Sequence, residues 1–255
     1  AGLVDGQKVT SEWNMSVAKN VGKANGTTAK TQAMAEAKSS WDQKADKEYF
    51  ENVKDVDSYE LFKPMLANDF TKTPVTSGYT QPKLDGIRCL VNNHGMNSRS
   101  GKPINSCPHI ADALKDFIKD YPSITLDGEL YNHELKSDFQ KIVSLVRKVK
   151  CRPEEIAESA ELVEYHIYDM FDADAPDMPF IERMHFLVKH LPVDAKIKIV
   201  ETAKTDTTAD IDKMYGEYTE AGYEGQMVRQ NTAYECKRSK NLLKRKEFIT
   251  EEFEV

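Results

Sequence analysis

The stretch Lys83-Leu84-Asp85-Gly86-Ile87-Arg88 follows Tyr79-Thr80-Gln81-Pro82 and leads into the apolar run 87–93. Asp-Gly between two extended segments is a common hairpin signal, so one interpretation is a purely structural turn. The other interpretation is chemical, because a rigid turn would hold the amine of Lys83 in a fixed place beside the guanidinium of Arg88. The six residues alone favour the turn, whereas residues farther along the chain favour the chemical interpretation.

A lysine acts as a nucleophile only in its neutral form. A free lysine amine has a pKa near 10.4, so neutralising it at pH 7 costs about 4–5 kcal/mol, which nearby cations or burial must supply. The segment LLKRK (242–246) provides such cations, because alternation along a strand would place Lys244 and Lys246 on one face. By itself, a basic strand end is more often a solvated surface.

Two further segments place an acid next to a glycine in an apolar strand context. They are LDGEL (126–130), with Glu129, and EGQMVR (224–229), with Glu224. Glycine permits a ligand to approach the backbone closely, and carboxylates are ligands that Mg²⁺ prefers. Either segment alone could be a strand that ends in a turn, so the combination is what indicates a ligand site.

Beyond residue 60, short strand-like runs alternate with helical stretches. The strand-like runs lie at 87–93, 123–130, 163–171, 196–202 and 224–230. The stretches with helical periodicity lie near 109–120, 137–149, 180–190 and 208–221, the last followed by Gly222. This order is typical of an α+β fold with mixed sheets and not of a repeated βαβ unit.

The first 60 residues differ from the remainder. Residues 28–47 carry alanines and Trp41 at helical spacing after Thr27 or Thr28 as an N-cap, so we predict one amphipathic helix there. Residues 51–60 are polar and acidic, which is typical of a linker. We therefore expect a separate N-terminal piece at 1–60, a main domain at 61–250 and a short remainder at 251–255.

The composition is that of a globular protein, with 40% hydrophobic and 30% charged residues among 255. We find no apolar run long enough to span a bilayer and no signal-peptide pattern, and we therefore expect a cytoplasmic protein without membrane contact. A net charge of −7 argues against indiscriminate coating of nucleic acid, although it leaves room for a local basic surface. The four cysteines are far apart and include no CxxC pair, which argues against a zinc site or a disulfide framework.

The order of these motifs resembles that of the covalent nucleotidyltransferase superfamily, and within it the ATP-dependent DNA ligases of viruses and phages. The matching motifs, between residue 64 and about residue 250, are Lys83-x-Asp-Gly-x-Arg88, Ser98-Arg99-x-Gly101, Asp127-Gly-Glu129, Tyr168-Asp169, Glu224-Gly-x-Met-Val-Arg229 and Leu242-Leu-Lys244-x-Lys246. The resemblance implies a nucleotidyltransferase (ATP-grasp-like ligase) fold of antiparallel sheets flanked by helices. It also implies an enzyme that seals DNA strands in repair, replication and recombination.

The resemblance assigns the nucleotide pocket residue by residue. Lys83 would attack the α-phosphate of ATP, release pyrophosphate and keep AMP as a lysyl phosphoramidate. Gln81 would contact the edge of the adenine, and Tyr168 would stack on the purine. Arg88 and Glu129 would hold the ribose. The cofactors that the resemblance implies are ATP, retained as covalent AMP, and Mg²⁺.

The remaining assignments concern the metal, the phosphates and DNA. Glu224 would bind the catalytic Mg²⁺, while Lys244 and Lys246 would neutralise charge on the α-phosphate and favour the neutral amine of Lys83. Arg99 would grip the 5′-phosphate of nicked duplex DNA, which receives AMP before the 3′-hydroxyl displaces it. We expect a monomer, in the host cytoplasm if the source is viral.

Related activities share part of this pattern. Arg88 after Asp-Gly-Ile resembles the ATP-dependent branch, since NAD-dependent ligases usually have a small residue there. The segment 224–229 resembles DNA ligases, whereas capping guanylyltransferases, which select GTP, usually carry Asp-Gly-Leu-Ile in that place. An RNA ligase fits less well. An alternative of another class is a nucleic-acid-binding module without the reaction, although the nucleophile, both acids and both lysines are present.

The two ends of the chain add expectations of their own. The N-terminal piece loosely resembles a WGR module, an α+β unit that binds nucleic acid through a small sheet and one helix, and Trp13 and Lys23 would then be the residues to test. The alternative is a generic extension. Residues 250–255 stand where an oligonucleotide-binding (OB-fold) barrel begins in this family. Without that barrel, we expect the chain to bind ATP or retain AMP but to adenylate itself weakly and to seal nicks more weakly still.

Overall fold

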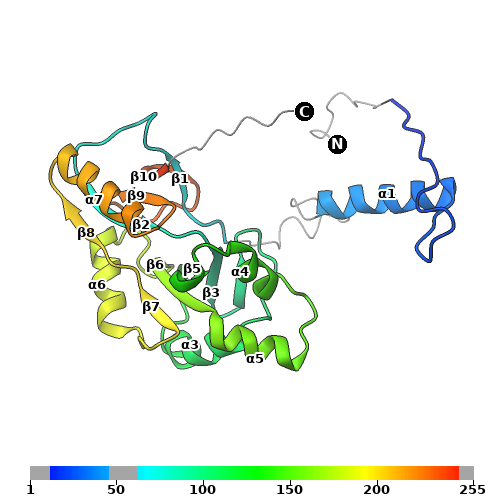
Figure 1. Ribbon diagram of the computed structural model, residues 1–255. Helices are drawn as coiled ribbons and strands as arrows, with labels where there is room; N and C mark the ends of the chain where they lie inside the picture. The colour runs from blue at the N-terminus through cyan, green and yellow to red at the C-terminus, as the bar shows by residue number, and fades with distance from the viewer. Residues whose placement is uncertain (1–11, 46–61, 247–255) are drawn as a thin grey trace. The chain divides into compact units, whose positions relative to one another are not determined.

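The computed structural model describes residues 12–45 and 62–246, and the chain divides into two compact units, residues 1–60 and 61–255 (Figure 1). Within the described ranges, no helix combines the length and the apolar character that a membrane span needs. The linker predicted at 51–60 and the start of an OB-fold barrel expected at 251–255 both lie outside the described residues.

The N-terminal unit contains a helix where one is predicted, α1 (Ala29–Ala45), but its apolar side chains do not gather on one face, so the amphipathic character predicted for it is wrong. The side chains of Thr28 and Thr31 cap it reciprocally: the N–H of Thr31 donates to Oγ1 of Thr28 at 3.2 Å, and the N–H of Thr28 donates to Oγ1 of Thr31 at 2.8 Å. No residue of α1 is buried, and Trp41 is 52% exposed. Residues 12–45 contain no strand and Trp13 is fully exposed, so the WGR-like assignment stays a prediction.

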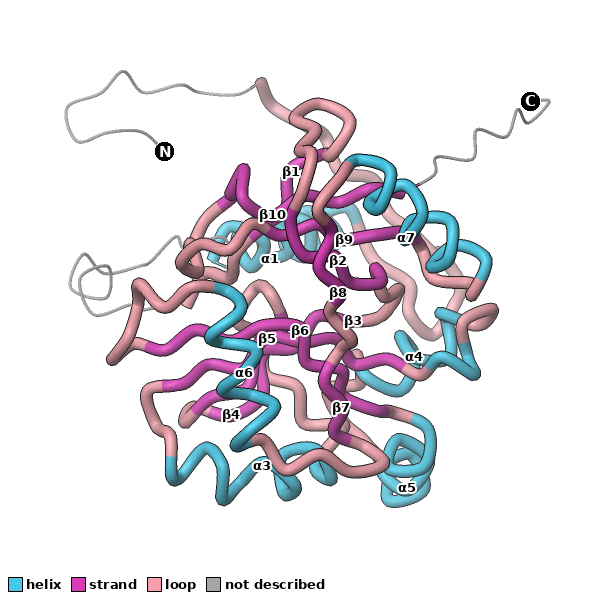
Figure 2. The backbone as a smooth tube through the Cα atoms, turned by 90° about the vertical axis from the view of Figure 1, so that its left-hand side faces the viewer, coloured by secondary structure: helices cyan, strands magenta, loops and turns pink. Residues whose placement is uncertain are grey.

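Two five-stranded sheets form the framework of the larger unit (Figures 1 and 2). The first sheet has β9 at its centre, with β2 and β10 as antiparallel neighbours, and β1 runs parallel to β10 at one edge. Its strands, in spatial order, are β1 (Leu66–Asp69), β10 (Arg238–Lys246), β9 (Gly225–Arg229), β2 (Gly78–Lys83) and β8 (Ala203–Thr205).

The second sheet is antiparallel except at one edge, where β6 and β7 are parallel. Parallel neighbours need a crossover connection, and helix α6 (Phe180–His190) lies between them in the chain. The strands, in spatial order, are β4 (Gly95–Ser98), β3 (Ile87–Asn92), β5 (Ile124–Tyr131), β6 (Glu164–Asp172) and β7 (Ile197–Ile199). All five predicted strand runs therefore contain strands, and the α+β class is confirmed, although each sheet has one parallel pair at its edge.

Helices pack against both sheets (Figure 2). The helical elements of this unit are α3 (Pro108–Asp120), the 3₁₀ turn η1 (His133–Leu135), α4 (Phe139–Val146), α5 (Pro153–Leu162), α6 (Phe180–His190) and α7 (Thr208–Glu220). Of these, α5 packs against α3 and α4, and η1 packs against α4. A core of 24 buried residues joins the second sheet to α3, α4 and α6. A much smaller core joins α7 to the first sheet and consists of Phe70, Ile211, Val228 and Leu243.

The stretch 83–88 connects the two sheets. It joins β2, which pairs with β8 and β9, to β3, which pairs with β4 and β5. The hairpin interpretation of the Asp-Gly pair is therefore wrong, because the chain passes from one sheet to the other at this turn. A Cβ atom on Gly86 would collide with the carbonyl oxygen of Leu130 and would lie 2.7 Å from Cγ of Glu129. Only glycine allows the turn to approach β5 this closely.

We expect Gly86→Ala to destabilise the protein by about 1–3 kcal/mol, because the added methyl group must displace the backbone of β5. Urea denaturation followed by circular dichroism measures the free energy of unfolding. Gly216→Ala in α7 is the matched control, because a Cβ there has no atom within 4 Å, and alanine favours a helix. A Gly86 variant as stable as the Gly216 variant would contradict the close packing.

Candidate active site

A cavity of about 280 Å³ lies between the two sheets. Residues of β1, β2, β9 and β10 line one side, and residues of β3, β5 and β6 line the other. Seven of the nine residues predicted for the site line this cavity: Gln81, Lys83, Arg88, Arg99, Glu129, Tyr168 and Lys244. The other two, Glu224 and Lys246, are connected to it by ion pairs that include Lys83.

The register of the first sheet explains why these side chains meet. Gly225 of the central strand β9 pairs with Lys83 of β2 on one side and with Lys246 of β10 on the other. Side chains two residues apart in a strand share a face. The next row on that face consists of Gln81, Met227 and Lys244. Lys244 and Lys246 therefore share a face, as alternation predicts.

Glu224 immediately precedes β9 and contacts Lys83 and Lys246, the two lysines that pair with Gly225. Its Oε2 accepts a hydrogen bond from the amine of Lys83, and its Oε1 accepts one from Lys246 at 3.1 Å. Burial alone would raise the pKa of Glu224, but the hydrogen bonds and charges of the two lysines lower it below its ordinary value. The sequence indicates cations around Lys83, whereas the structure places a carboxylate between Lys83 and Lys246.

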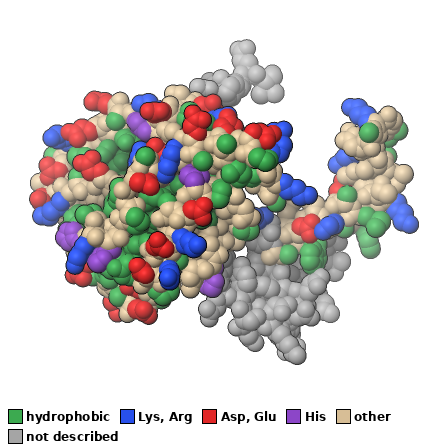
Figure 3. Space-filling model, turned by 90° about the horizontal axis from the view of Figure 1, so that it is seen from below, with side chains coloured by type: hydrophobic (Ala, Val, Ile, Leu, Met, Phe, Trp, Pro, Cys, Tyr) green, Lys and Arg blue, Asp and Glu red, His purple; other side chains and the backbone are tan. Residues whose placement is uncertain are grey.

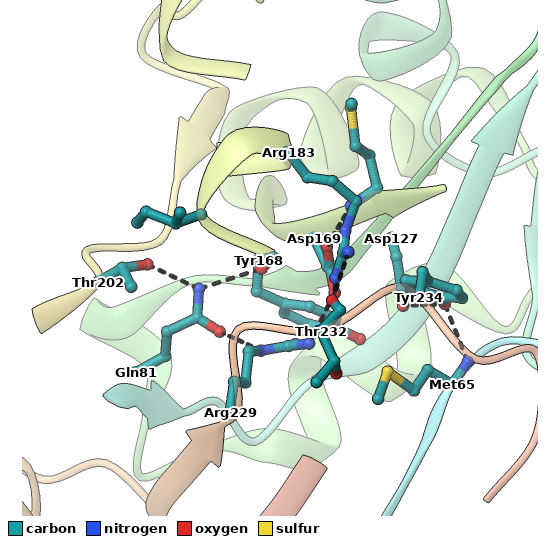
Figure 4. Close-up of polar contacts among 12 residues, drawn as sticks. Met65, Gln81, Asp127, Tyr168, Asp169, Arg183, Thr202, Arg229, Thr232 and Tyr234 are labelled. Carbon is teal, nitrogen blue, oxygen red and sulfur yellow. Dashed lines mark hydrogen bonds and ion pairs between the residues drawn. The ribbon is translucent and has the colours of Figure 1, made fainter. Parts of the chain in front are cut away.

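Gln81 is held by three polar partners (Figure 4). Its Nε2 donates to the carbonyl oxygen of Tyr168 at 3.0 Å and to Oγ1 of Thr202 at 2.9 Å. Its Oε1 accepts from Nε of Arg229 at 2.8 Å. A carbonyl can only accept and a guanidinium can only donate, so the orientation of the amide is determined at both ends. Both N–H groups of the amide are used, and a lone pair on Oε1 is left over.

Arg229 is itself positioned by a buried carboxylate (Figure 4). Asp169 of β6 is fully buried and accepts hydrogen bonds at 2.7 Å from both Arg229 and Arg183. Arg183, from α6, also donates to the carbonyl oxygens of Met178 and Thr232. The motifs contain Asp169 and Arg229, but nothing in the sequence around Arg183 indicates this contact. The network fixes the wall of the cavity behind Gln81.

Arg88, predicted to hold a ribose, is anchored within the protein. It donates to Oδ1 of Asp127 at 2.8 Å and to the carbonyl oxygen of Met65 at 2.8 Å, and Asp127 also accepts a bond from the hydroxyl of Tyr234. A second N–H of Arg88 bonds the other oxygen of Asp127, so three of the five N–H groups of an arginine are used. The same guanidinium lies 5.8 Å from the ring centre of Tyr168. A ligand contact by Arg88 is therefore limited to the N–H groups that remain.

Glu129 and Arg99 differ in their environments. Burial raises the pKa of Glu129 to about 8, although the charges of Arg88 and Lys83 act in the opposite direction. Its carboxyl is therefore mainly protonated at pH 7 and can donate as well as accept a hydrogen bond. Arg99 follows β4, is exposed, and lines the cavity from its rim.

Comparison with known proteins places the larger unit in a family. Residues 64–246 match the family described as the ATP dependent DNA ligase domain. The chain is 30% identical over 175 residues to a DNA ligase of Archaeoglobus fulgidus, covering 64% of this chain and 30% of that protein. It is 26% identical over 194 residues to a DNA ligase of Haemophilus influenzae, covering 75% and 66%. It is 25% identical over 233 residues to a DNA ligase of African swine fever virus, covering 85% and 52%.

The chain thus spans between 30% and 66% of the length of these three relatives. Two solved structures share its fold. The Chlorella virus DNA ligase-adenylate has a TM-score of 0.56 at 23% identity, over 74% of this chain and 70% of that one. The ATP-dependent DNA ligase of bacteriophage T7, complexed with ATP, has a TM-score of 0.56 at 17% identity, over 72% and 68%. Since the family match covers most of its length, this chain belongs to the family of ATP dependent DNA ligase domains.

Proposed function

We propose that this chain is the adenylation domain of an ATP-dependent DNA ligase, in which Lys83 takes AMP from ATP and passes it to the 5′-phosphate of a nick. The observation that carries the proposal is the pair of ion pairs that Glu224 forms with Lys83 and Lys246 beside the cavity. Attack on the α-phosphate needs the neutral amine of Lys83, and Glu224 accepts the hydrogen bond from that amine. The N–P bond forms as the bond to pyrophosphate breaks, and Lys244 and Lys246 would offset the negative charge there.

The orientation of the Gln81 amide favours binding of ATP over binding of GTP. Because both N–H groups are bonded within the protein, the side chain can accept a hydrogen bond from the 6-amino group of adenine but has none to donate to the 6-oxo group of guanine. A site that leaves a polar group of a ligand unpaired discriminates strongly against that ligand. The ring of Tyr168 would stack on the purine. These features count against a capping-type guanylyltransferase.

Glu224 would also hold Mg²⁺ together with phosphate oxygens of ATP. Proteins usually bind Mg²⁺ through one or two carboxylates plus substrate phosphates. Within residues 12–45 and 62–246, no cluster of three acidic, histidine or cysteine side chains could form a metal site by itself. The single carboxylate of Glu224 therefore fits a metal that arrives with the nucleotide. Bound there, the metal would supply Lewis-acid stabilisation of charge on the α-phosphate.

The remaining assignments use the other groups at the cavity. Glu129, protonated at pH 7, would donate to a ribose hydroxyl, and Arg88 would use its free N–H groups on the same ribose. Arg99, at the rim, would bind the 5′-phosphate of nicked duplex DNA. We propose in addition a cytoplasmic monomer in which residues 1–60 form a separate module before the adenylation domain at 61–250.

Lys83→Arg should abolish acid-labile labelling of the full chain by radiolabelled ATP, because a guanidinium stays protonated and is not a nucleophile at neutral pH. Gel autoradiography with Mg²⁺ present, with labelled GTP in parallel, measures the label. Lys204→Arg, at an exposed lysine of β8, is the matched control and should label like the unmodified chain. Labelling by GTP alone would contradict the ligase assignment, and labelling that persists in Lys83→Arg would mean another nucleophile.

Glu224→Gln should lower the rate of ATP labelling by roughly 10²-fold or more, because it removes the charge that would hold Mg²⁺ while keeping the size of the side chain. The rate is measured across a titration of magnesium chloride. Glu220→Gln, at an exposed acid of α7, is the control and should keep the magnesium dependence of the unmodified chain. An unchanged dependence in Glu224→Gln would remove this residue from the metal site.

Glu129→Gln should stabilise the protein more at pH 8 than at pH 5. The pKa of Glu129 is about 8 in the folded protein and 4.5 ordinarily, so between these values the folded state keeps a proton that the unfolded state has released. Stability therefore falls as the pH rises through this window, and a neutral amide avoids that loss. The gain over the unmodified chain should grow by about 1–3 kcal/mol from pH 5 to pH 8, measured by urea denaturation. A gain that is the same at both values would contradict the raised pKa.

A further inference from the structure

The turn 221–224 between α7 and β9 leads directly to Glu224. The N–H of Tyr223 donates to the carbonyl oxygen of Tyr218 at 3.0 Å, a hydrogen bond that closes the end of a helix in a Schellman motif. The N–H of Glu224 donates to the carbonyl oxygen of Lys83 at 3.1 Å. The backbone of this turn therefore fixes where the carboxylate of Glu224 meets the amine of Lys83.

Two side chains that approach from the second sheet hold the carbonyl oxygen of Ala221, the C-cap residue of α7. Nε2 of His133 donates to this oxygen at 3.2 Å, and Nζ of Lys136 donates to it at 2.9 Å. His133 begins η1, which follows β5, and Lys136 is the C-cap residue of η1. The last carbonyl groups of a helix lack partners within it and carry partial negative charge, so an N–H donor and a cation both stabilise them. The end of α7 is thus attached to the second sheet shortly before Glu224.

The ring of His133 is itself oriented from two sides. Its Nδ1 lies 2.7 Å from the hydroxyl oxygen of Tyr131, a residue only 2% exposed. Because the carbonyl of Ala221 can only accept, Nε2 carries the hydrogen, and Nδ1 of the neutral ring accepts the hydroxyl hydrogen of Tyr131. Burial lowers the pKa of His133 below its ordinary value, which favours the neutral ring at pH 7. The ring also contacts that of Tyr223, with 4.4 Å between the ring centres.

Capping of α7 would be a purely structural explanation of these contacts. Acidic, basic and histidine side chains are intermixed on the face drawn in Figure 3, so a surface histidine is ordinary in this protein. Lys136 alone would supply a donor for the helix end. His133, however, bonds through both ring nitrogens and contacts Tyr223, the neighbour of Glu224 in the chain. Its contacts converge on the segment that carries the acid of the site.

We propose that His133 is a positioning residue for the transfer of AMP to Lys83. Through its contacts with Ala221 and Tyr223, it holds Glu224 where the carboxylate meets the attacking amine. The inference rests on the proposed function, because the alignment of Glu224 matters to the reaction only if its carboxylate accepts the bond from that amine and holds Mg²⁺. His133 does not line the nucleotide cavity, so it acts on the rate of the transfer and not on the binding of adenine or ribose.

His133→Ala in the full chain should lower the rate of ATP labelling at saturating ATP and Mg²⁺ roughly tenfold, because small displacements of a reacting group lower rates steeply. The Mg²⁺ concentration for half-maximal rate should rise roughly threefold or more, a shift that a smaller folded fraction would not produce. The KM for ATP should change by less than about twofold, since the proposed contacts of the base and ribose remain. His133→Gln should recover most of the rate, because its amide can donate to Ala221 from about the position of Nε2.

A second measurement does not depend on activity. Hydrogen exchange of the Glu224 amide, followed by NMR without nucleotide, reports how often its bond to the carbonyl of Lys83 opens. His133→Ala should raise the rate of this exchange roughly tenfold, because the turn loses a hydrogen bond, while the amides of β5 keep their rates. His185→Ala, at an exposed histidine of α6, is the matched control and should leave the labelling and the exchange unchanged.

The proposal is overturned if His133→Ala labels at the rate of the unmodified chain, or if its Glu224 amide exchanges no faster. An equal rise of exchange in β5 would also overturn it, because that would show a general loss of stability. The same holds if His133→Gln is as slow as His133→Ala. Absence of ATP labelling in the unmodified chain would contradict the proposed function, while the exchange comparison would still decide whether His133 holds Glu224 in place.

Discussion

The pairing of β9 with both β2 and β10 is the constraint on which the site depends. Neighbouring strands lie about 4.8 Å apart, so an acid at the start of the central strand reaches the lysines of both neighbours. A slip of one residue in either pairing would turn a lysine to the opposite face of the sheet. Gly225 supports this register, because a Cβ there would collide with the carbonyl oxygen of Arg245 on β10. The juxtaposition of Lys83, Glu224 and Lys246 is therefore a property of the sheet.

Polar contacts join the two sheets behind the cavity. Arg229 of the first sheet bonds Asp169 of the second, and Gln81 of the first bonds the backbone of Tyr168 in the second. Removing one partner of a buried ion pair typically costs about 3–5 kcal/mol, because a charge is left without compensation. The bonds that hold the sheets together also fix the orientation of the Gln81 amide. The stability of the fold and the proposed preference for adenine over guanine therefore depend on the same contacts.

Elements with their own start and stop signals could be predicted from the sequence, whereas pairings between distant strands could not. Helix α7 begins with the reciprocal cap of Thr207 and Asp210 and ends before Gly222, whose φ of +89° suits glycine. Helix α5 has comparable signals, Pro153 in its first turn followed by two acids, although it is not among the predicted helices. The Asp-Gly pair predicts a turn correctly, but the sheets to which its flanking strands belong depend on tertiary packing.

The residues of the site also divide into those that a local motif predicts and those that only the folded chain brings together. Motif order predicts residues that the structure brings to one cavity, because each motif is local in the chain. Partners such as Thr202 and Arg183 come from segments without a motif, and only the folded arrangement brings them to Gln81 and Asp169. The catalytic roles of the site residues stay predictions. Contacts within the protein limit which groups of these side chains are left to bind a ligand.

The two sheets differ in the number of buried residues that support them, and this difference affects how readily each sheet opens locally. The second sheet rests on 24 buried residues, whereas α7 holds the first sheet through a core of four. Regions with less buried apolar surface open locally at lower free energy, so backbone amides of β8 and α7 should exchange their hydrogens well before those of β3, β5 and β6. A nucleotide attached to Lys83 and packed on Tyr168 would bridge both sheets. Under the proposed function, a bound nucleotide would therefore slow hydrogen exchange in the first sheet.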